Sequence, residues 1–155
     1  MKFLKFIFAM FLSFVPGFLG LIVTPIFSGG NLWYDTLNVS VLTPAGWVFS
    51  VVWTILYILI GVALFLIMID DKNDKTSAYT LFGVNLVLNA LWSYSFFGTE
   101  MPKFALLVLA ALIIIAIFMA RAFYRINRAA FWLVTPYIVW LFFAFYLNGM
   151  IIYLN

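Results

Sequence analysis

Formal charges are confined to a few short segments of this 155-residue chain, and the long stretches between them carry none. Eight Lys and Arg with five Asp and Glu make up only 8% of the residues, whereas a soluble domain is about 25% charged. A charge in the middle of a bilayer costs several kcal/mol, and roughly 20 apolar residues in a helix cross the ~30 Å hydrocarbon layer. The pattern therefore predicts an all-α integral membrane protein.

Five stretches have the length of a membrane span, at about residues 3–23, 44–69, 76–98, 102–123 and 129–153. They predict a five-transmembrane-helix bundle that occupies residues 1–155 as a single domain, with a loop at 25–43. The apolar runs do not alternate with polar residues, which argues against a barrel. Thr43 is expected to cap the second helix, with Pro44 in its first turn.

The first stretch has a competing interpretation as a cleaved signal peptide, because Lys2 and Lys5 precede an apolar run. The run extends past Pro16-Gly17 to Val23, and no convincing small-x-small cleavage site follows it. A membrane span is therefore favoured for this segment.

The basic residues predict an orientation. Seven of them fall in residues 1–5, 70–76 and 121–128, and only Lys103 falls on the other side. The positive-inside rule then places the N terminus in the cytoplasm and the C terminus outside. The extracytoplasmic loop at 25–43 has Asp35 as its only charge and carries the pair Trp33-Tyr34. Such an aromatic loop is expected either to fold back as a lid over the bundle or to lie in the membrane interface.

The absence of certain residue types excludes several kinds of chemistry. The chain has no Cys and no His, so thiol nucleophiles, imidazole bases and the usual zinc, copper and iron sites are excluded, and no metal site or cofactor is predicted. No Asp, Glu or Lys lies in the interior of a predicted span, away from its ends, which argues against ion-coupled transport. The charges are too few and too dispersed for a nucleic-acid surface.

The polar groups within the spans are amides, hydroxyls and indoles. Asn85, Asn89, Trp92 and Phe96 share one face of the third predicted helix, with Ser93 beside them, and this face must look inward because an amide in lipid needs a partner. Interhelical hydrogen bonding is the favoured role for Asn85. For Asn89, hydrogen bonding and ligand contact both stay open.

Aromatic residues form similar stripes on the second and fifth predicted helices. These stripes are Phe49, Trp53, Tyr57 and Ile60 on the second, and Pro136, Trp140, Phe143, Ala144 and Leu147 on the fifth, with Asn148 at its edge. Trp33, Trp47 and Trp132 fit the interfacial belt. Trp53, Trp92 and Trp140 lie deeper, where they either line a cavity or fill the core. A cavity walled by such rings, with space opened by a kink at Pro136, suits a large flat hydrophobic ligand.

Three blocks of residues carry a family resemblance. They are Trp33-Tyr34-Asp35-Thr36-Leu37 with Thr43-Pro44, Phe49, Trp53 and Tyr57; Asn85, Asn89, Trp92, Ser93, Phe96, Phe97 and Gly98; and Pro136, Tyr137, Trp140, Phe143, Ala144, Leu147 and Asn148. Over nearly the whole chain they resemble the signature of the TspO/MBR family, the tryptophan-rich sensory proteins related to the mitochondrial translocator protein or peripheral benzodiazepine receptor. The chain is similar to bacterial members.

The resemblance implies a homodimer in a bacterial cell membrane that binds porphyrins, protoporphyrin IX above all and haem as a further candidate. Benzodiazepine-type and isoquinoline ligands would share the pocket. The ligand-binding residues that it implies are Tyr34, Pro44, Phe49, Trp53, Tyr57, Asn89, Trp92, Ser93, Trp140, Ala144 and Leu147. It also implies light-dependent breakdown of protoporphyrin. The indoles of Trp53 and Trp140 are readily oxidised, and if they face each other across the pocket they would donate electrons in this reaction.

The sequence departs from the family pattern at three places. Asn38-Val39 replaces a common Lys-Pro pair, and Thr43-Pro44 replaces a double proline. The sterol motif of animal members has Leu147 and Tyr153 here but no basic residue after them, so sterol binding by that motif is not supported.

Three functions stay open at this point: a porphyrin-binding protein that degrades its ligand in light, a tetrapyrrole sensor without turnover, and a tetrapyrrole transporter. No obvious inverted repeat supports transport. The lack of conventional acids, bases and metals means that catalysis would depend on the chemistry of the ligand.

Overall fold

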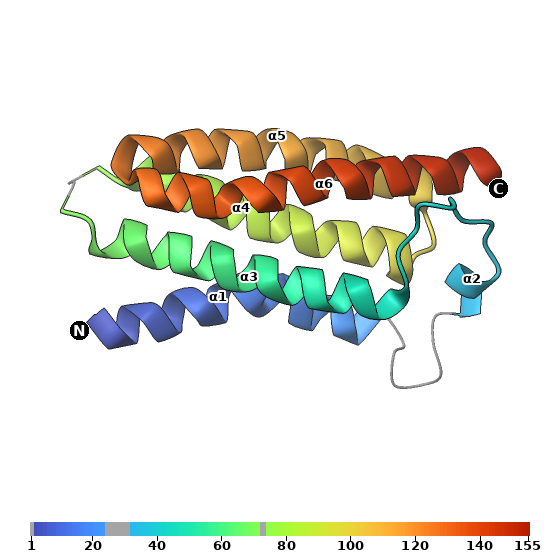
Figure 1. Ribbon diagram of the computed structural model, residues 1–155, viewed down its shortest axis with the longest axis horizontal. Helices are drawn as coiled ribbons and strands as arrows, with labels where there is room; N and C mark the ends of the chain where they lie inside the picture. Colours follow the sequence, from blue (N-terminus) through green and yellow to red (C-terminus); the bar gives the residue numbers. More distant parts are fainter. Residues whose placement is uncertain (1, 24–31, 72–73) are drawn as a thin grey trace.

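A computed structural model describes residues 2–23, 32–71 and 74–155 (Figure 1). Five long helices make up most of it: α1 (Lys2–Val23), α3 (Gly46–Ile69), α4 (Thr76–Ser93), α5 (Pro102–Ile126) and α6 (Arg128–Leu154). The short helix α2 (Leu32–Asp35) lies in the connection between α1 and α3, and the π-helical segment η2 (Tyr94–Gly98) extends α4. All five long helices, with η2 counted as part of the α4 span, are apolar enough to cross a membrane, which confirms the predicted all-α bundle with five candidate spans.

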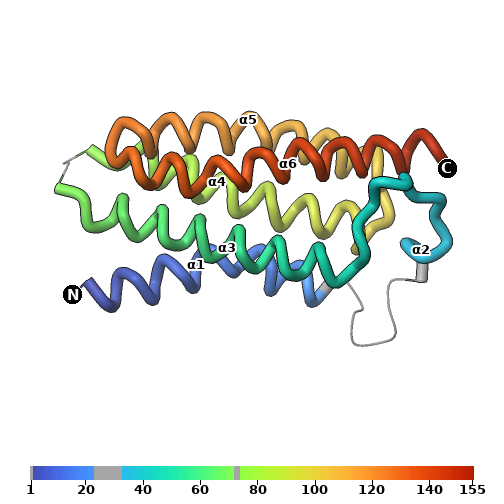
Figure 2. The backbone as a smooth tube through the Cα atoms, in the orientation of Figure 1, coloured from blue at the N-terminus to red at the C-terminus, as the bar shows by residue number. Residues whose placement is uncertain are grey.

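The helices lie side by side along the long axis of the molecule, with the two ends of the chain at opposite ends of the bundle (Figure 2). Their main contacts are α1 with α3, α3 with α6, α6 with α5, α5 with α4, and α4 with α1. Each helix therefore packs against two others, and the five close into a ring. This arrangement brings the inner faces of α3, α4 and α6 toward a common interior.

Local sequence explains where α5 and α6 begin. Pro102 occupies the first turn of α5, where its missing N–H is not needed. The Asn127 side chain accepts hydrogen bonds from the N–H groups of Ala129 and Ala130, so it caps α6. Helix α6 then continues through Pro136 to Leu154.

The predicted start of the second helix is wrong. Helix α3 begins at Gly46, and its N-cap residue is Ala45, which offers no side-chain hydrogen bond. Thr43 instead donates its backbone N–H to the carbonyl oxygen of Ser40 at 2.9 Å. The turn at Ser40 and the extended backbone favoured before proline together keep Thr43 and Pro44 out of the helix.

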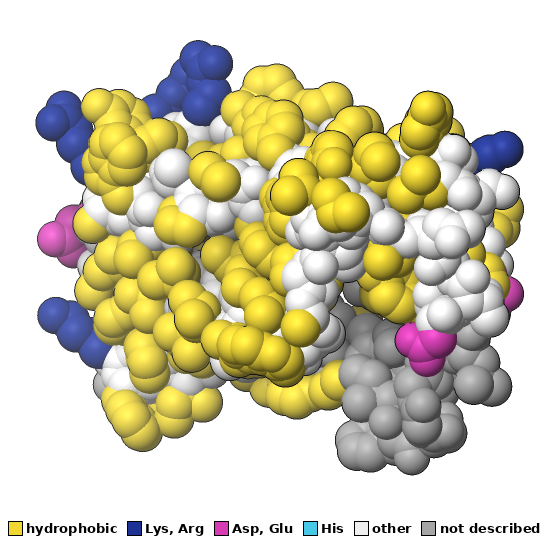
Figure 3. Space-filling model, turned by 45° about the vertical axis from the view of Figure 1, so that its right-hand side comes forward, with side chains coloured by type: hydrophobic (Ala, Val, Ile, Leu, Met, Phe, Trp, Pro, Cys, Tyr) yellow, Lys and Arg dark blue, Asp and Glu magenta, His cyan; other side chains and the backbone are white. Residues whose placement is uncertain are grey.

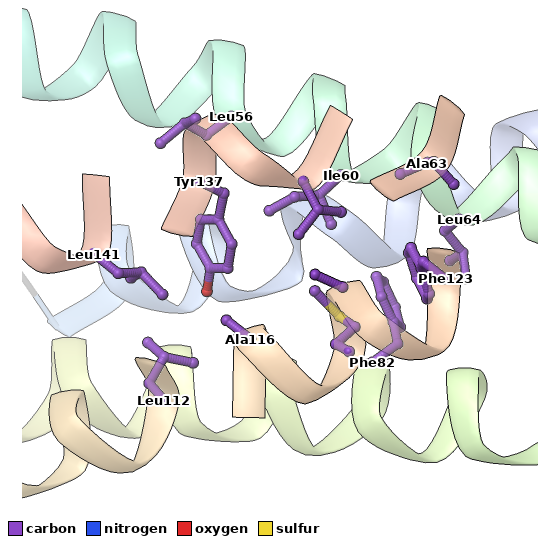
Figure 4. Packing of buried hydrophobic residues seen from close by; sticks show 14 of the residues in the cluster. Leu56, Ile60, Ala63, Leu64, Phe82, Leu112, Ala116, Phe123, Tyr137 and Leu141 are labelled. Carbon is purple, nitrogen blue, oxygen red and sulfur yellow. The ribbon is translucent and has the colours of Figure 1, made fainter. Parts of the chain in front are cut away.

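Small side chains let the helices approach closely. A Cβ added at Gly61 of α3 would lie 2.6 Å from Met10 Sδ and 2.7 Å from Ser13 Oγ, so α1 crosses α3 against bare backbone. The interior between α3, α4, α5 and α6 is filled by aliphatic residues, two phenylalanines and Tyr137, several of which are drawn in Figure 4. Its fully or almost fully buried members include Ala63, Ile67, Ala78, Phe82, Leu112, Ala116, Met119, Ala120, Phe123 and Ala130.

The outer surface agrees with a bilayer environment. Hydrophobic side chains cover much of the face drawn in Figure 3, and the charged side chains visible there lie at its two ends. Large apolar residues such as Ile22, Val139 and Phe142 are exposed on the outer surface of the bundle. An integral membrane protein accounts for both observations.

Candidate functional site

A chain of four hydrogen-bonded polar side chains joins α3, α4 and α6 inside the bundle. The Tyr57 hydroxyl donates to Asn89 Oδ1 at 3.3 Å, and Asn89 Nδ2 donates to the Tyr137 hydroxyl at 3.0 Å. Tyr137 in turn donates to Asn85 Oδ1 at 3.2 Å. All four residues are buried, and we call this group the polar chain.

The polar chain confirms that Asn85 and Asn89 face inward. Both amides make interhelical hydrogen bonds, as favoured for Asn85 from the sequence. Their common partner Tyr137 is fully buried, and its role was not predicted, although it lies one turn before Trp140 on the same face of α6. A buried tyrosine hydroxyl needs a hydrogen-bond partner, and this requirement could have indicated from the sequence that Tyr137 pairs with an amide of another helix. Asn85 Nδ2 has no hydrogen-bond partner among the described residues.

An aromatic stack continues from the polar chain toward the loop end of the bundle. The Trp53 ring stacks on Tyr57 at 5.5 Å between ring centroids, and it lies 6.2 Å from Trp92 and 6.3 Å from Tyr137. Trp92 stacks on Phe96 of η2 at 5.8 Å. These rings come from three helices and fill the interior at this end of the bundle. At the opposite end most of the interior is filled by aliphatic side chains.

Trp92 is held in place by its indole N–H. Its Nε1 donates to Asn148 Oδ1 of α6 at 3.3 Å, and Asn148 Nδ2 donates to the backbone oxygen of Pro102 at 2.9 Å. Asn148 is almost fully buried, so these bonds link α4, α5 and α6 at this level. The orientation of the Trp92 ring is therefore fixed by the bundle itself.

The described part of the loop between α1 and α3 contacts the same stack. Trp33 and Tyr34 of α2 lie 5.6 Å and 6.1 Å from the Phe96 ring, and Tyr34 also lies 5.9 Å from Phe97. Burial raises the pKa of the Tyr34 phenol, and the neighbouring Asp35 carboxylate raises the pKa further. We call the rings of Tyr57, Trp53, Trp92, Phe96, Trp33 and Tyr34 the aromatic column.

The loop is also fastened to the C-terminal end of α6. Asn38 N–H donates to Asn155 Oδ1 at 2.9 Å, and Asn155 Nδ2 donates back to the Asn38 carbonyl oxygen at 3.0 Å. The hydroxyls of Ser40 and Tyr146 share a further hydrogen bond at 3.1 Å. These contacts, which we call the loop clasp, were not predicted. The part of the predicted lid at residues 25–31 lies outside the described residues.

Trp140 lies in a second group of rings, contributed by α3 and α6. Its ring is 5.7 Å from Phe49 and 5.4 Å from Phe143. It also lines an open groove of about 560 Å³ whose walls are almost wholly apolar. We call this the apolar groove; its lining residues are Val52, Ile55, Leu56, Leu59, Pro136, Val139, Trp140 and Phe143.

The indole N–H of Trp140 is the unusual feature of the groove. The Nε1 atom is buried and has no hydrogen-bond partner among the described residues. An unpaired buried donor costs about 1–3 kcal/mol, so a ligand that brings an acceptor to this atom would recover that free energy. Within the described ranges no group of three or more acidic side chains is placed to hold a metal ion.

The other ligand-binding residues implied by the resemblance lie around these two groups. Ala144 and Leu147 are buried on the inner face of α6. Ser93 lies beside α1, where a Cβ at Gly20 would be 3.4 Å from its hydroxyl. Pro44 is half-buried just before α3. Trp53 thus belongs to the aromatic column and Trp140 to the apolar groove.

Comparison with known proteins agrees with this architecture. The TspO/MBR family model matches residues 9–154. The chain belongs to the TspO/MBR family. It is 37% identical to the tryptophan-rich protein TspO of Chlorobaculum tepidum over 93% of this chain and 91% of that one. It is 32% identical to the protein of the same name from Archaeoglobus fulgidus over 100% of this chain and 99% of that one. The translocator protein of Bos taurus is 31% identical, over 85% and 79% of the two chains.

Proposed function

We propose that this TspO/MBR protein binds a porphyrin, protoporphyrin IX in the first instance, between the apolar groove and the aromatic column. The observation that carries the proposal is the apolar groove, whose wall includes the Trp140 ring, together with the buried Trp140 indole N–H, which has no hydrogen-bond partner among the described residues. A volume of about 560 Å³ lies within the 300–1,000 Å³ range of small-molecule sites. Apolar walls suit a flat, largely apolar ring, and the Trp140 indole N–H would donate to a polar group that the ring brings to it.

The other residues of the set have complementary roles in this proposal. Trp53, Tyr57 and Trp92 offer ring faces, and Asn89 offers an amide beside them. Phe49 packs its ring against Trp140, which lines the groove. Tyr34 and Pro44 belong to the connection between α1 and α3, which serves as the lid in this proposal. Benzodiazepine-type ligands would use the same apolar walls.

We further propose that bound protoporphyrin is degraded in light. A photoexcited porphyrin accepts an electron, and the indoles of Trp53 and Trp140 are oxidisable groups at the proposed site. The protein's part is to hold the ring against these donors and away from bulk water. A non-catalytic tetrapyrrole sensor is the second candidate, and the loop clasp favours it, because a ligand that displaced the clasp would change the outer surface.

The proposal also includes the setting of the protein. The count of seven basic residues against one supports a cytoplasmic N terminus and an extracytoplasmic C terminus in a bacterial cell membrane. We propose a homodimer because the resemblance to the family implies one. Chemical crosslinking in native membranes tests the dimer, and labelling of single introduced cysteines from each side tests the orientation.

The binding proposal is tested by titrating the purified protein in detergent with protoporphyrin IX while the Soret band is followed. Trp140→Phe keeps a ring but loses the donor, so its Kd should rise about tenfold, the effect of roughly 1.4 kcal/mol. Trp132→Phe on the exposed face of α6 is the matched control and should bind like the parent. A parent that shows no saturable binding would disprove the proposal.

Breakdown is tested by illuminating the saturated complexes. The parent should consume bound porphyrin and give products that differ from those of free porphyrin in micelles, and Trp53→Phe should slow this reaction. Identical products with and without protein would exclude breakdown and leave sensing as the function.

A further inference from the structure

The aromatic column is continuous from the interior of the bundle to the loop at its end. Trp53 lies 6.2 Å from Trp92, Trp92 lies 5.8 Å from Phe96, and Phe96 lies 5.6 Å from Trp33 and 6.1 Å from Tyr34. Electron tunnelling between rings weakens steeply with distance, so a series of neighbouring rings is a far better route than one long step. The column connects the proposed porphyrin site with a tyrosine outside the spans.

The chemical identity of these rings suits the transfer of an electron. Indoles and phenols lose an electron much more readily than aliphatic side chains or a phenylalanine ring, and the chain has no Cys to compete with them. Trp53, Trp92 and Trp33 can therefore each carry the oxidised state for a time. Phe96 is too hard to oxidise and acts as the bridge between Trp92 and the two loop rings.

The direction of transfer follows from where a tyrosine proton can go. A tyrosine is oxidised easily only when its phenolic proton can leave. The hydroxyls of Tyr57 and Tyr137 donate to the amide oxygens of Asn89 and Asn85, which are not bases. Tyr34 is half-buried rather than buried and lies in α2 at the end of the bundle (Figure 1), so its proton has a shorter way to water than the protons of Tyr57 and Tyr137.

We infer that the aromatic column is an electron relay through which Tyr34 re-reduces an oxidised Trp53. This inference rests on the proposed function, because photoexcited porphyrin is the oxidant that takes one electron from Trp53. Trp92 then reduces Trp53, and Tyr34, directly or through Trp33, reduces Trp92 and releases its proton to water. The porphyrin passes its extra electron to dioxygen, which becomes superoxide. The balance is one electron from Tyr34 to dioxygen, one proton to water and a neutral tyrosyl radical.

The relay is tested first without any ligand. A laser flash that photoionises indole in the ligand-free protein creates tryptophan radicals, and the later rise of tyrosyl absorption is recorded. The relay predicts that Tyr34→Phe removes part of this rise. Phe96→Leu and Trp92→Phe should each slow the part of the tyrosyl rise that comes from Tyr34 several-fold. Trp92→Phe provides the test if Phe96→Leu folds poorly.

Phe82→Leu is the matched control, because Phe82 is a phenylalanine of the same span with almost the same exposure, 4% against 3% for Phe96, and it lies off the column. It should leave the tyrosyl rise unchanged. If Tyr34→Phe gives the same rise as the parent, the relay is wrong. This measurement needs no porphyrin, so a failure of porphyrin binding leaves its result standing.

A second measurement follows the porphyrin complex under red light, which porphyrin absorbs and indole does not. Peptide mass spectrometry should find more oxidised Trp53 in Phe96→Leu than in Phe82→Leu, because the damaged ring is no longer re-reduced. Equal Trp53 oxidation in the two variants, at equal porphyrin occupancy, would contradict the relay.

Discussion

The two halves of the bundle fill their interiors with different kinds of side chain. Near the α5–α6 connection, residues such as Met119, Ala120 and Phe123 are almost fully buried and fill the interior with apolar atoms. Toward the loop end, the interior holds amides, hydroxyls and large rings, and it includes a buried indole N–H at Trp140 that has no partner within the described part of the chain. The first half gains stability from every contact. The second half keeps a buried donor without a partner among the described residues, which is the group that the binding proposal assigns to a ligand.

The largest expected effect comes from opening a cavity in the aliphatic half. Phe123 is fully buried, so Phe123→Ala should lower the free energy of unfolding by about 3–5 kcal/mol. Phe118→Ala, on the exposed face of the same helix, is the control and should stay close to the parent in the same detergent. Denaturant unfolding measures both. Equal losses would mean that the interior of this half is not tightly packed.

A somewhat smaller effect is expected where α1 meets α3. Gly61→Ala places a methyl group against Met10 and Ser13 and should cost about 1–3 kcal/mol through overpacking. Gly83→Ala provides the contrast, since its new Cβ meets nothing within 4 Å and helix propensity alone should stabilise by about 0.5–1 kcal/mol. The same sign for both variants would show that the close approach of α1 is not required.

The polar chain separates the two halves, and its removal is expected to have an intermediate cost. Tyr137→Phe deletes the hydroxyl that Asn85 and Asn89 share, leaving two buried amide atoms unpaired, at about 1–3 kcal/mol. Tyr57→Phe removes only one bond and should cost less. Thermal unfolding in detergent ranks the two variants. A larger loss of thermal stability for Tyr57→Phe than for Tyr137→Phe would mean that Tyr137 is not the central residue of the polar chain.

The smallest effect on stability is expected at the loop clasp. Asn155→Ala removes the paired hydrogen bonds to Asn38, which lie in an exposed region, and should change the free energy of unfolding by less than about 1 kcal/mol. Its visible consequence should be faster proteolysis of the segment between α2 and α3. Tyr153→Phe, at an exposed neighbouring position, should leave the cleavage rate unchanged.

The difference between the halves also explains what could be predicted from the sequence. Spans follow from the cost of charge in lipid, which is local in sequence, so five helices were predictable from the charge-free stretches. The start of α3 was not, because the turn that holds Thr43 depends on Ser40 and the backbone before Pro44. Asn85 and Asn89 were predicted to face inward because an amide in lipid has few alternatives.

For the candidate site, the sequence predicts which residues share a helix face but not which of these faces contact one another. Helical spacing places Trp53 and Trp140 on inner faces of their own helices, but it contains no information on how α3 and α6 are rotated against each other. That rotation puts Trp53 against Trp92 and Tyr137, and Trp140 against Phe49. The contacts of the loop with Phe96 and Asn155 join residues far apart in the chain, and no local pattern specifies them.

The central claim, that one half of the bundle binds and the other half packs, is tested most directly by one pair of variants with the same replacement. Trp53→Leu and Phe123→Leu each remove a ring from one half, and both are titrated with protoporphyrin IX by the change in the Soret band. The account predicts a Kd about tenfold higher for Trp53→Leu, because ring stacking is lost, and an unchanged Kd for Phe123→Leu. Equal affinities for the two variants, or weaker binding only in Phe123→Leu, would contradict it.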